Sequence, residues 1–326
     1  MFENHKIYKT TLSGREIEVE ISKFAGLANG SCLVRYGDTV VLATATASEK
    51  PREGIDFLPL SVDFEERLYA VGKIPGSFLK REGRPSEKAI LAGRAIDRPI
   101  RPLFPKDLRN DIAISILVLS VDPDNPPEVA GALGASIALS ISDIPWNGPT
   151  ATVNVGLIDG QIILNPNSAE REKSDLALTV AGTKEKVVMI EAGANQVPND
   201  VMLEAIFKAH EEVKRLVSFI EDIAKEVGKP KFTYESADVP AELYEEIKEF
   251  CLEKVKTALY TNDKEKRDNA INKVYDEIVE AFSEKYPDDV NYFAEILYKI
   301  QKSVVRRWLL DENKRVDGRG LHEIRP

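Results

Sequence analysis

Glycine is distributed very unevenly along this chain of 326 residues, and this constrains its fold more than any other feature. Seventeen of the 19 glycines lie in residues 1–228, and the next one after Gly228 is Gly318. Glycine marks turns and weakens helices, so the first part has the turn-rich pattern of a protein with many strands. The 89 residues from 229 to 317 favour helix almost throughout.

Alternating apolar residues predict several strands in the first part. Two runs, Ser31–Tyr36 and Thr39–Thr46, are separated only by Gly37-Asp38, which predicts a tight hairpin. We expect other strands at 16–23, 57–64, 112–121, 150–158, 161–164, 175–180 and 186–191, and a helix of small apolar residues at 128–142. The strands cluster instead of alternating strictly with helices, which indicates an α+β class with a mixed sheet.

Apolar residues at helical spacing predict a long amphipathic helix at 199–227. Gly228 and Pro230 mark its end. Three further helical segments, rich in Lys and Glu, are expected near 241–260, 264–285 and 289–311. These predictions divide the chain into a first domain at 1–228, a linker at 229–240 and a small all-α bundle at 241–312.

Composition excludes several classes of protein. The chain is 43% hydrophobic and 30% charged, and none of its apolar runs approaches the roughly 20 residues of a membrane helix. We therefore expect no membrane contact, no signal peptide and a cytoplasmic location. Cys32 and Cys251 are too few for a disulfide framework and are expected to be buried. Three scattered histidines exclude a histidine-rich metal centre.

The net charge of −10 hides one strongly basic segment between Lys73 and Lys106. This segment holds nine basic and three acidic residues, a net charge of +6, so the rest of the chain sums to −16. Such segregation attracts a polyanion to one place. Within it, residues 72–85 are predicted to form a loop that sets Phe78 beside Lys80 and Arg81. A flat ring among cations is the combination that single-stranded nucleic acid needs.

A helix capped by Ser86 is expected to follow this loop, with Arg94 and Arg98 on one face. Pro99 and Pro102 are expected to end it early. Residue types alone leave two interpretations open. The segment either binds RNA or is a surface loop with one buried ring and an ion-paired arginine face.

Two weaker motifs have a structural interpretation that we favour. Asp56, Asp63, Glu65 and Glu66 lie on or beside one strand and could bind a metal. Asp63 and Glu65 share a face while Glu66 points away, which favours a solvated or ion-paired edge. The pair Gly131-x-x-Gly134 is half of a dinucleotide-binding fingerprint, but close packing of a helix explains it better.

Long motifs in the chain closely resemble the first core domain of the bacterial polynucleotide phosphorylase family. One is IPGSFLKREGRPSEKAILAGRAIDRPIRPLFP at Ile74–Pro105, and others lie at Gly30–Ser48, Gly54–Phe78 and Ala132–Pro149. The match continues to Gly228, and the helical region is similar to the family's all-helical domain. The last residues, Arg315–Pro326, resemble the opening of the second core domain. The resemblance implies an RNase PH-like core at 1–228 and a stub of a second core at 313–326.

The resemblance also implies an activity. Family members degrade single-stranded RNA from 3′ to 5′ with inorganic phosphate as co-substrate, release nucleoside diphosphates and use Mg²⁺. They form a homotrimeric ring in which each chain supplies two RNase PH-like halves, and RNA-degradation machinery is a further partner. We expect this chain to be the N-terminal part of such an enzyme, with the Mg²⁺ site in the second core.

The chemistry of the family's active half is not matched by these residues. That half holds phosphate with a serine-rich loop, where this chain has two prolines and a glutamate at Asn125–Glu128. It also places an aspartate and a lysine before Val-Ala-Gly, where this chain has Ala177 and Thr179. Asp175 stands alone. We therefore expect no catalytic residue and no metal ligand in this part.

The RNA-contacting positions of the family are better preserved. Its channel loop has two phenylalanines followed by two basic residues, and this chain has Phe78, Leu79, Lys80 and Arg81. The expected RNA-binding residues are Phe78, Lys80, Arg81, Arg84, Arg94, Arg98 and Arg101. Two alternatives stay open: catalysis by other residues, or a purely oligomeric role in which the basic segment pairs with a neighbouring subunit.

Overall fold

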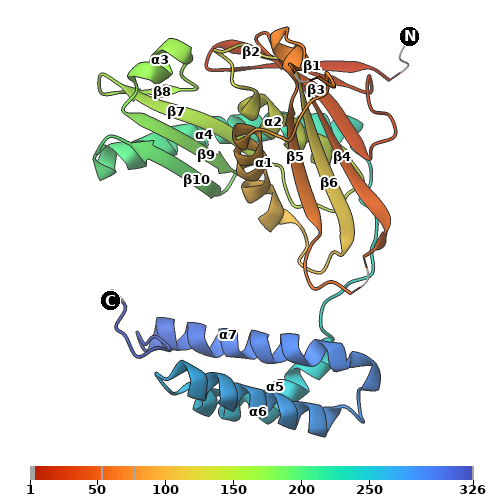
Figure 1. Cartoon of the computed structure of the whole chain (residues 1–326), viewed down its shortest axis with the longest axis vertical. Coiled ribbons are helices and arrows are strands. Elements are labelled where there is room, and N and C mark those ends of the chain that lie inside the picture. Colours follow the sequence, from red (N-terminus) through yellow and green to blue (C-terminus); the bar gives the residue numbers. More distant parts are fainter. Residues whose placement is uncertain (1–3, 53, 77, 325–326) are drawn as a thin grey trace. The chain divides into compact units, whose positions relative to one another are not determined.

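The computed structural model describes residues 4–52, 54–76 and 78–324. In this part the chain forms two compact units that divide between Ala237 and Asp238. The first unit (unit 1) combines two sheets with helices, and the second (unit 2) consists of helices (Figure 1). The expected α+β core with an all-helical bundle after it is confirmed.

The larger sheet of unit 1 is mixed, as expected. Its strand order is β1 (Lys6–Leu12), β2 (Arg15–Ile21), β3 (Gly30–Tyr36), β4 (Thr39–Pro51), β6 (Asn110–Ser120) and β5 (Leu60–Glu66). Tyr36 pairs with Thr39 across the β3–β4 turn, which confirms the hairpin at Gly37-Asp38. β5 runs parallel to β6 and forms one edge of the sheet, whereas the other neighbouring strands are antiparallel.

The second sheet is antiparallel, in the order β10 (Val187–Ala194), β9 (Leu176–Gly182), β7 (Ala151–Ile158) and β8 (Gln161–Leu164). The short helix α3 (Ser168–Lys173) follows β8 and begins in a capping box of Asn167 and Glu170. Helix α4 (Asn199–Val227) packs on β7 and β9 through its apolar face, which confirms the long amphipathic helix.

Helix α2 (Pro127–Ile141) is buried along almost its whole length and packs on β3 and β4. A Cβ atom added at Gly134 would lie 2.8 Å from the Cβ of Ala43, and one at Gly131 would lie 3.0 Å from Ile116 and Phe64. Only glycine permits so close an approach. The packing interpretation of the Gly131-x-x-Gly134 pair is therefore confirmed.

Helix α1 (Glu87–Ile100) lies along β5 and brings the basic segment to this edge of the sheet (Figure 1). Ser86 caps it by accepting a hydrogen bond of 3.0 Å from the Ala89 N–H. The helix ends at Ile100, between Pro99 and Pro102 as expected, and a 3₁₀ turn, Arg101–Leu103, follows it. The indole N–H of Trp146, which is 46 residues away in the sequence, donates to the Ile100 carbonyl at 3.1 Å. This carbonyl at the end of the helix thereby gains a hydrogen-bond partner.

Residues 229–237, within the segment expected to be a linker, are hydrogen-bonded along unit 1, and we call them the strap. The Lys229 and Phe232 N–H groups donate to Ile141 and Asp143 carbonyls at 3.0 and 2.7 Å. The Lys231 ammonium donates to three carbonyls at the end of α2, at 2.6 to 3.1 Å. A cation in this position complements the unsatisfied carbonyls of the helix.

Unit 2 contains α5 (Ala241–Leu259), α6 (Lys264–Phe282) and α7 (Phe293–Asp311), with a 3₁₀ turn at Pro287–Tyr292 before α7. The three helices pack around a core that includes Ile247, Cys251, Ile278 and Phe293. None of the helices in the described part of the chain combines the length and the apolar character needed to cross a bilayer.

Candidate nucleic-acid interface

The basic segment begins with a loop, residues 72–86, that we call the Phe78 loop; Ser77 lies outside the described residues. Its first end is held by the N–H groups of Gly72 and Lys73, which donate to the Tyr69 and Leu68 carbonyls at 3.0 and 2.9 Å. Its returning end is held by residues 82 and 86. The Leu68 N–H donates to the Glu82 carboxylate at 3.0 Å, and the Ser86 hydroxyl donates to Glu66 at 3.0 Å. The loop therefore has fixed ends, although its sequence contains no regular element.

The tip of the Phe78 loop is turned out into solvent. The Phe78 side chain is 99% exposed and that of Leu79 is 71% exposed. Lys80 has a φ of 54°, a left-handed conformation that a residue with a Cβ adopts at a cost of about 1 kcal/mol. The sequence interpretation in which the ring is buried is therefore wrong for Phe78, and its face is open to a ligand.

Most cations of the loop have no partner among the residues that the structure describes. Lys80, Arg81 and Arg84 are exposed and make no hydrogen bond or ion pair with their side chains to any described residue. The same holds for Arg94 on α1. These charges are not neutralised by neighbouring carboxylates, and they therefore leave a positive potential around the Phe78 ring.

Arg98 and Arg101 differ, because carboxylates engage both guanidinium groups. Arg98 forms an ion pair of 2.8 Å with Glu191 on β10. Arg101 binds Asp97 through two nitrogens at 2.8 and 2.9 Å and also donates to the carbonyls of Leu58 and Leu60. The structure thus brings Phe78, Lys80, Arg81 and Arg84 together and gives Arg98 and Arg101 partners of their own. RNA contact by any of the seven residues stays a prediction.

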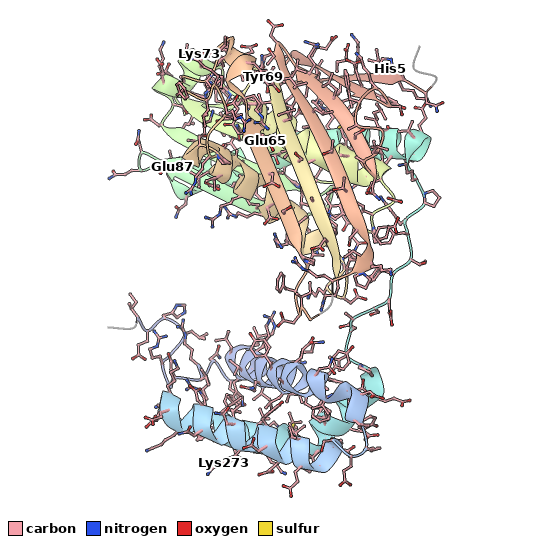
Figure 2. All side chains as sticks on the ribbon, turned by 45° about the vertical axis from the view of Figure 1, so that its right-hand side comes forward. His5, Glu65, Tyr69, Lys73, Glu87 and Lys273 are labelled. Carbon is pink, nitrogen blue, oxygen red and sulfur yellow. The ribbon has the colours of Figure 1, made fainter. Side chains whose placement is uncertain are left out.

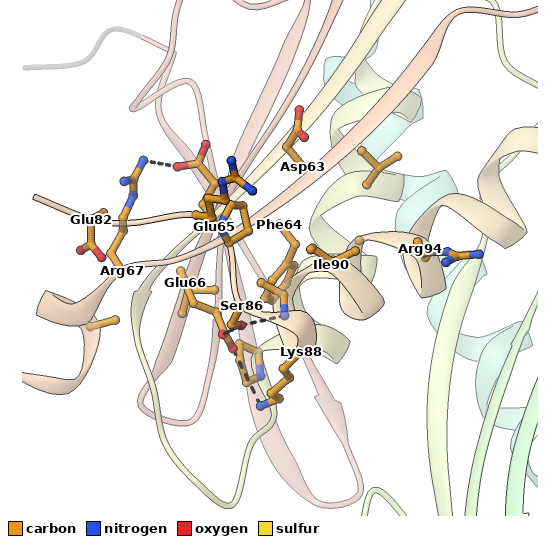
Figure 3. A pocket seen from close by; sticks show the side chains of 18 of the residues that line it. Asp63, Phe64, Glu65, Glu66, Arg67, Glu82, Ser86, Lys88, Ile90 and Arg94 are labelled. Atoms are coloured by element: carbon orange, nitrogen blue, oxygen red, sulfur yellow. Dashed lines mark hydrogen bonds and ion pairs between the residues drawn. The ribbon is translucent and has the colours of Figure 1, made fainter.

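A groove of about 1000 Å³ lies between β5, α1 and the end of the Phe78 loop (Figure 3). Two of the carboxylates on its β5 side are neutralised locally. Glu65 pairs with Arg67, and Glu66 accepts from Ser86 and lies 3.8 Å from the Lys88 ammonium. The ion-paired interpretation of these two glutamates is confirmed. In Figure 3 Arg94 extends away from the carboxylates.

The positions that correspond to the family's catalytic groups carry other chemistry here. Helix α2 begins at Pro127 with Pro126 as its N-cap, and Glu128 in its first turn binds Lys88 at 3.0 Å. On β9, the Thr179 hydroxyl donates to the Asn154 amide oxygen at 2.9 Å, and Ala177 offers only a methyl group. A methyl, a hydroxyl and a carboxylate held by lysine do not fit Mg²⁺, which prefers several free oxygen ligands.

Two acidic residues of this region were not among the predicted site residues. Both hold the returning end of the Phe78 loop, Glu82 by accepting from the Leu68 N–H and Glu66 by accepting from the Ser86 hydroxyl. Glu82 is the sole acidic residue between Lys80 and Arg84, and this isolation within a basic stretch is the sequence signal that points to it. Among the described residues, no group of three or more His, Cys, Asp or Glu side chains could hold a metal ion.

The two sheets with their helices define an RNase PH-like fold. Solved structures with this fold include the Archaeoglobus fulgidus exosome with RNA bound to the active site, at a TM-score of 0.50 and 20% identity over 62% of this chain and 87% of that one. Rice Rrp46 has a TM-score of 0.52 and 13% identity over 69% of this chain and 96% of that one. At these identities the likeness supports the fold alone.

Sequence comparisons then define the family. The models for domains 1 and 2 of the 3′ exoribonuclease family match residues 13–145 and 148–212, so the chain belongs to this family. The model "Polyribonucleotide nucleotidyltransferase, RNA binding domain" matches residues 242–320. The resemblance to the N-terminal part of that enzyme is confirmed.

Two curated relatives illustrate the match. The polyribonucleotide nucleotidyltransferase of Ruminiclostridium cellulolyticum is 58% identical over 98% of this chain and 46% of its own length. That of Caldicellulosiruptor saccharolyticus is 57% identical over the same shares. The chain thus spans about half the length of the curated relatives it matches.

Proposed function

We propose that this chain is the RNA-guiding and ring-forming part of a phosphorolytic 3′-to-5′ exoribonuclease, and that the Phe78 loop holds single-stranded RNA. One observation carries this assignment. A fully exposed ring stands beside cations that have no partner among the described residues, on a loop whose two ends are fixed by hydrogen bonds. Any base can stack on the ring while the cations attract phosphates, so such a site takes RNA of any sequence.

In this proposal the predicted residues have two roles. Phe78, Lys80, Arg81, Arg84 and Arg94 contact RNA, because their side chains are exposed and have no partner in the described part of the chain. Arg98 positions α1 through Glu191 on β10, and Arg101 does so through the carbonyls of Leu58 and Leu60. Within unit 1, the proposed RNA contact thus lies on the loop and the outer face of α1.

Fluorescence anisotropy with a labelled oligouridylate, titrated at several salt concentrations, tests this assignment. Phe78→Ala is expected to weaken binding about tenfold without changing the salt dependence, because it removes one stacked base. Arg81→Ala is expected to lower the slope of log K against log salt by about 0.7, the value for one phosphate of a single strand. Phe207→Ala, which removes a 60% exposed ring from α4, is the control. Unchanged binding by both loop variants rejects the assignment.

We further propose that this part of the enzyme does not itself catalyse phosphorolysis. The prolines at the start of α2 remove two N–H donors that would hold phosphate, and Glu128 would repel it. Mg²⁺ and the attacking phosphate would then act in the second core domain of the relatives. Incubation of the chain with RNA, Mg²⁺ and inorganic phosphate tests this proposal, and release of nucleoside diphosphates above the buffer rate would refute it.

The proposal also includes assembly into a trimer in the cytoplasm. The trimer would associate with other RNA-degradation proteins. Exposed apolar side chains support a role in assembly, among them Ile90 and Leu91 on α1. A purely oligomeric role predicts assembly without RNA binding. Light scattering combined with the anisotropy titration separates these two functions.

A further inference from the structure

Helix α7 carries a row of exposed residues on the side opposite its core face. Its buried residues are Phe293, Ile296, Leu297, Ile300 and Val304. Tyr298, Lys302 and Arg306 follow one another at intervals of four and therefore lie along one outer face. All three are exposed, the Tyr298 side chain by 62%.

The two cations of this row differ from most others in unit 2. Every lysine of α5 is ion-paired: Lys248 with Glu245, Lys254 with Glu277 and Lys256 with Glu253. Lys302 and Arg306 form no ion pair with any described residue. Moreover, no position three or four residues from either holds a carboxylate.

This arrangement weakens the helix, because like charges one turn apart repel each other. The core of the bundle gains nothing from these two cations, since neither side chain is among its buried residues. The Lys302 ammonium instead lies 5.8 Å from the centroid of the Tyr298 ring. An exposed ring on the same helix face as cations without ion pairs is suited to a ligand in which flat groups alternate with anionic groups.

We propose that the outer face of α7, formed by Tyr298, Lys302 and Arg306, binds single-stranded RNA. The inference rests on the proposed function, because it takes the same RNA as ligand. Lys302 and Arg306 lie about 6 Å apart along the helix axis and bind neighbouring phosphates, while one base stacks on Tyr298. An acidic protein surface would pair with the cations but would not need the exposed ring. The match of residues 242–320 to a model named as an RNA binding domain supports the choice of RNA.

Anisotropy titrations of the full chain with a labelled oligouridylate test this site. The double variant Lys302→Gln/Arg306→Gln is expected to lower the salt slope by about 1.4, which is about 0.7 for each phosphate contact. Tyr298→Ala is expected to weaken binding about tenfold at constant slope, and Tyr298→Phe to restore it. The matched control is Lys264→Gln/Lys273→Gln on α6, which removes the same charge from two exposed lysines that have a carboxylate three or four residues away in the sequence. Lys273 is labelled in Figure 2.

The outcomes separate this site from the Phe78 loop. The α7 site is supported if the double variant has a lower slope of log K against log salt while the α6 control behaves like the wild type. The far-ultraviolet circular dichroism spectrum of the double variant must then be unchanged. Wild-type binding by the α7 variants while Phe78→Ala is impaired overturns the α7 site and leaves the proposed function intact. No binding by the wild-type chain overturns both. Binding of polyglutamate as tight as that of RNA, and insensitive to Tyr298→Ala, overturns the α7 site in favour of an acidic protein.

Discussion

Glu82 accepts a hydrogen bond of 3.0 Å from the backbone N–H of Leu68, and this bond fixes the returning end of the Phe78 loop against the 3₁₀ turn Leu68–Val71, which follows β5. Leu68 is the first residue of a 3₁₀ turn, so its N–H has no partner within that turn. One carboxylate in a basic stretch thereby orders a loop whose tip has no packing contacts of its own.

Loss of this bond is expected to loosen the loop. Glu82→Ala removes the acceptor, whereas Glu82→Gln keeps an acceptor oxygen and removes the same charge. Because ordering of a mobile loop costs binding free energy, the alanine variant is expected to bind oligouridylate about threefold to tenfold more weakly than the glutamine variant. Trypsin is also expected to cleave after Lys80 or Arg81 faster in the alanine variant. Equal affinities and cleavage rates would show that the bond does not order the loop.

Arg94 and Arg101 are expected to respond to substitution in opposite ways. Arg101→Gln removes the pair with Asp97 and two bonds to carbonyls, so it is expected to lower the free energy of unfolding of unit 1 by about 1 kcal/mol. Arg94→Gln is expected to leave stability unchanged and to weaken RNA binding. Urea unfolding followed by Trp146 fluorescence in a Trp308→Phe background measures unit 1 alone. A stable Arg101→Gln chain with impaired RNA binding would reverse the two roles.

Asp107 is expected to make attachment of the strap dependent on pH. Burial raises the pKa of this carboxyl, but hydrogen bonds from Ser236 at 2.6 Å and Tyr234 at 2.9 Å outweigh that effect and hold the pKa below its usual range. A lowered pKa in the folded state stabilises the fold at pH values above the unfolded pKa of about 4, and this contribution disappears as pH falls through the folded pKa.

The comparison of wild type with Asp107→Asn tests this linkage. The wild-type chain is expected to be the more stable at pH 7, and the difference is expected to shrink in acid. Urea unfolding monitored by Trp146 at both pH values measures it. A difference that grows in acid would show that the carboxylate does not stabilise the strap.

The two cysteines are expected to be inert in the native chain. Burial raises the pKa of the Cys32 thiol to about 12 and that of Cys251 to about 11, so almost no thiolate exists near pH 8. Ellman's reagent is expected to detect no thiol before unfolding and two after it. Because the cysteines lie in different units, partial reaction of Cys251 alone in mild denaturant would show that unit 2 opens first. Rapid reaction of Cys32 in buffer would contradict its burial.

Much of the fold follows from local patterns. The hairpin at Gly37-Asp38, the cap at Ser86 and the long helix of residues 199–227 were predicted, because turn chemistry, capping and apolar period act over a few residues. The strand β1 was missed, since its apolar Ile7 lies on the exposed face and polar residues occupy most of its other positions. Helix α3 was missed because its six residues are too few to show a helical repeat of apolar positions.

In the candidate site, too, some features follow from the local sequence and others from long-range packing. The sequence by itself determined that a phenylalanine would lie among cations on a loop, because neighbours along the chain set that composition. Only the tertiary structure decided which cations have no partner. Arg98 finds Glu191 from 93 residues away, and Arg101 reaches carbonyls more than 40 residues back in the chain. Long-range pairing depends on how α1 packs against β5 and β10, and no local pattern encodes that packing.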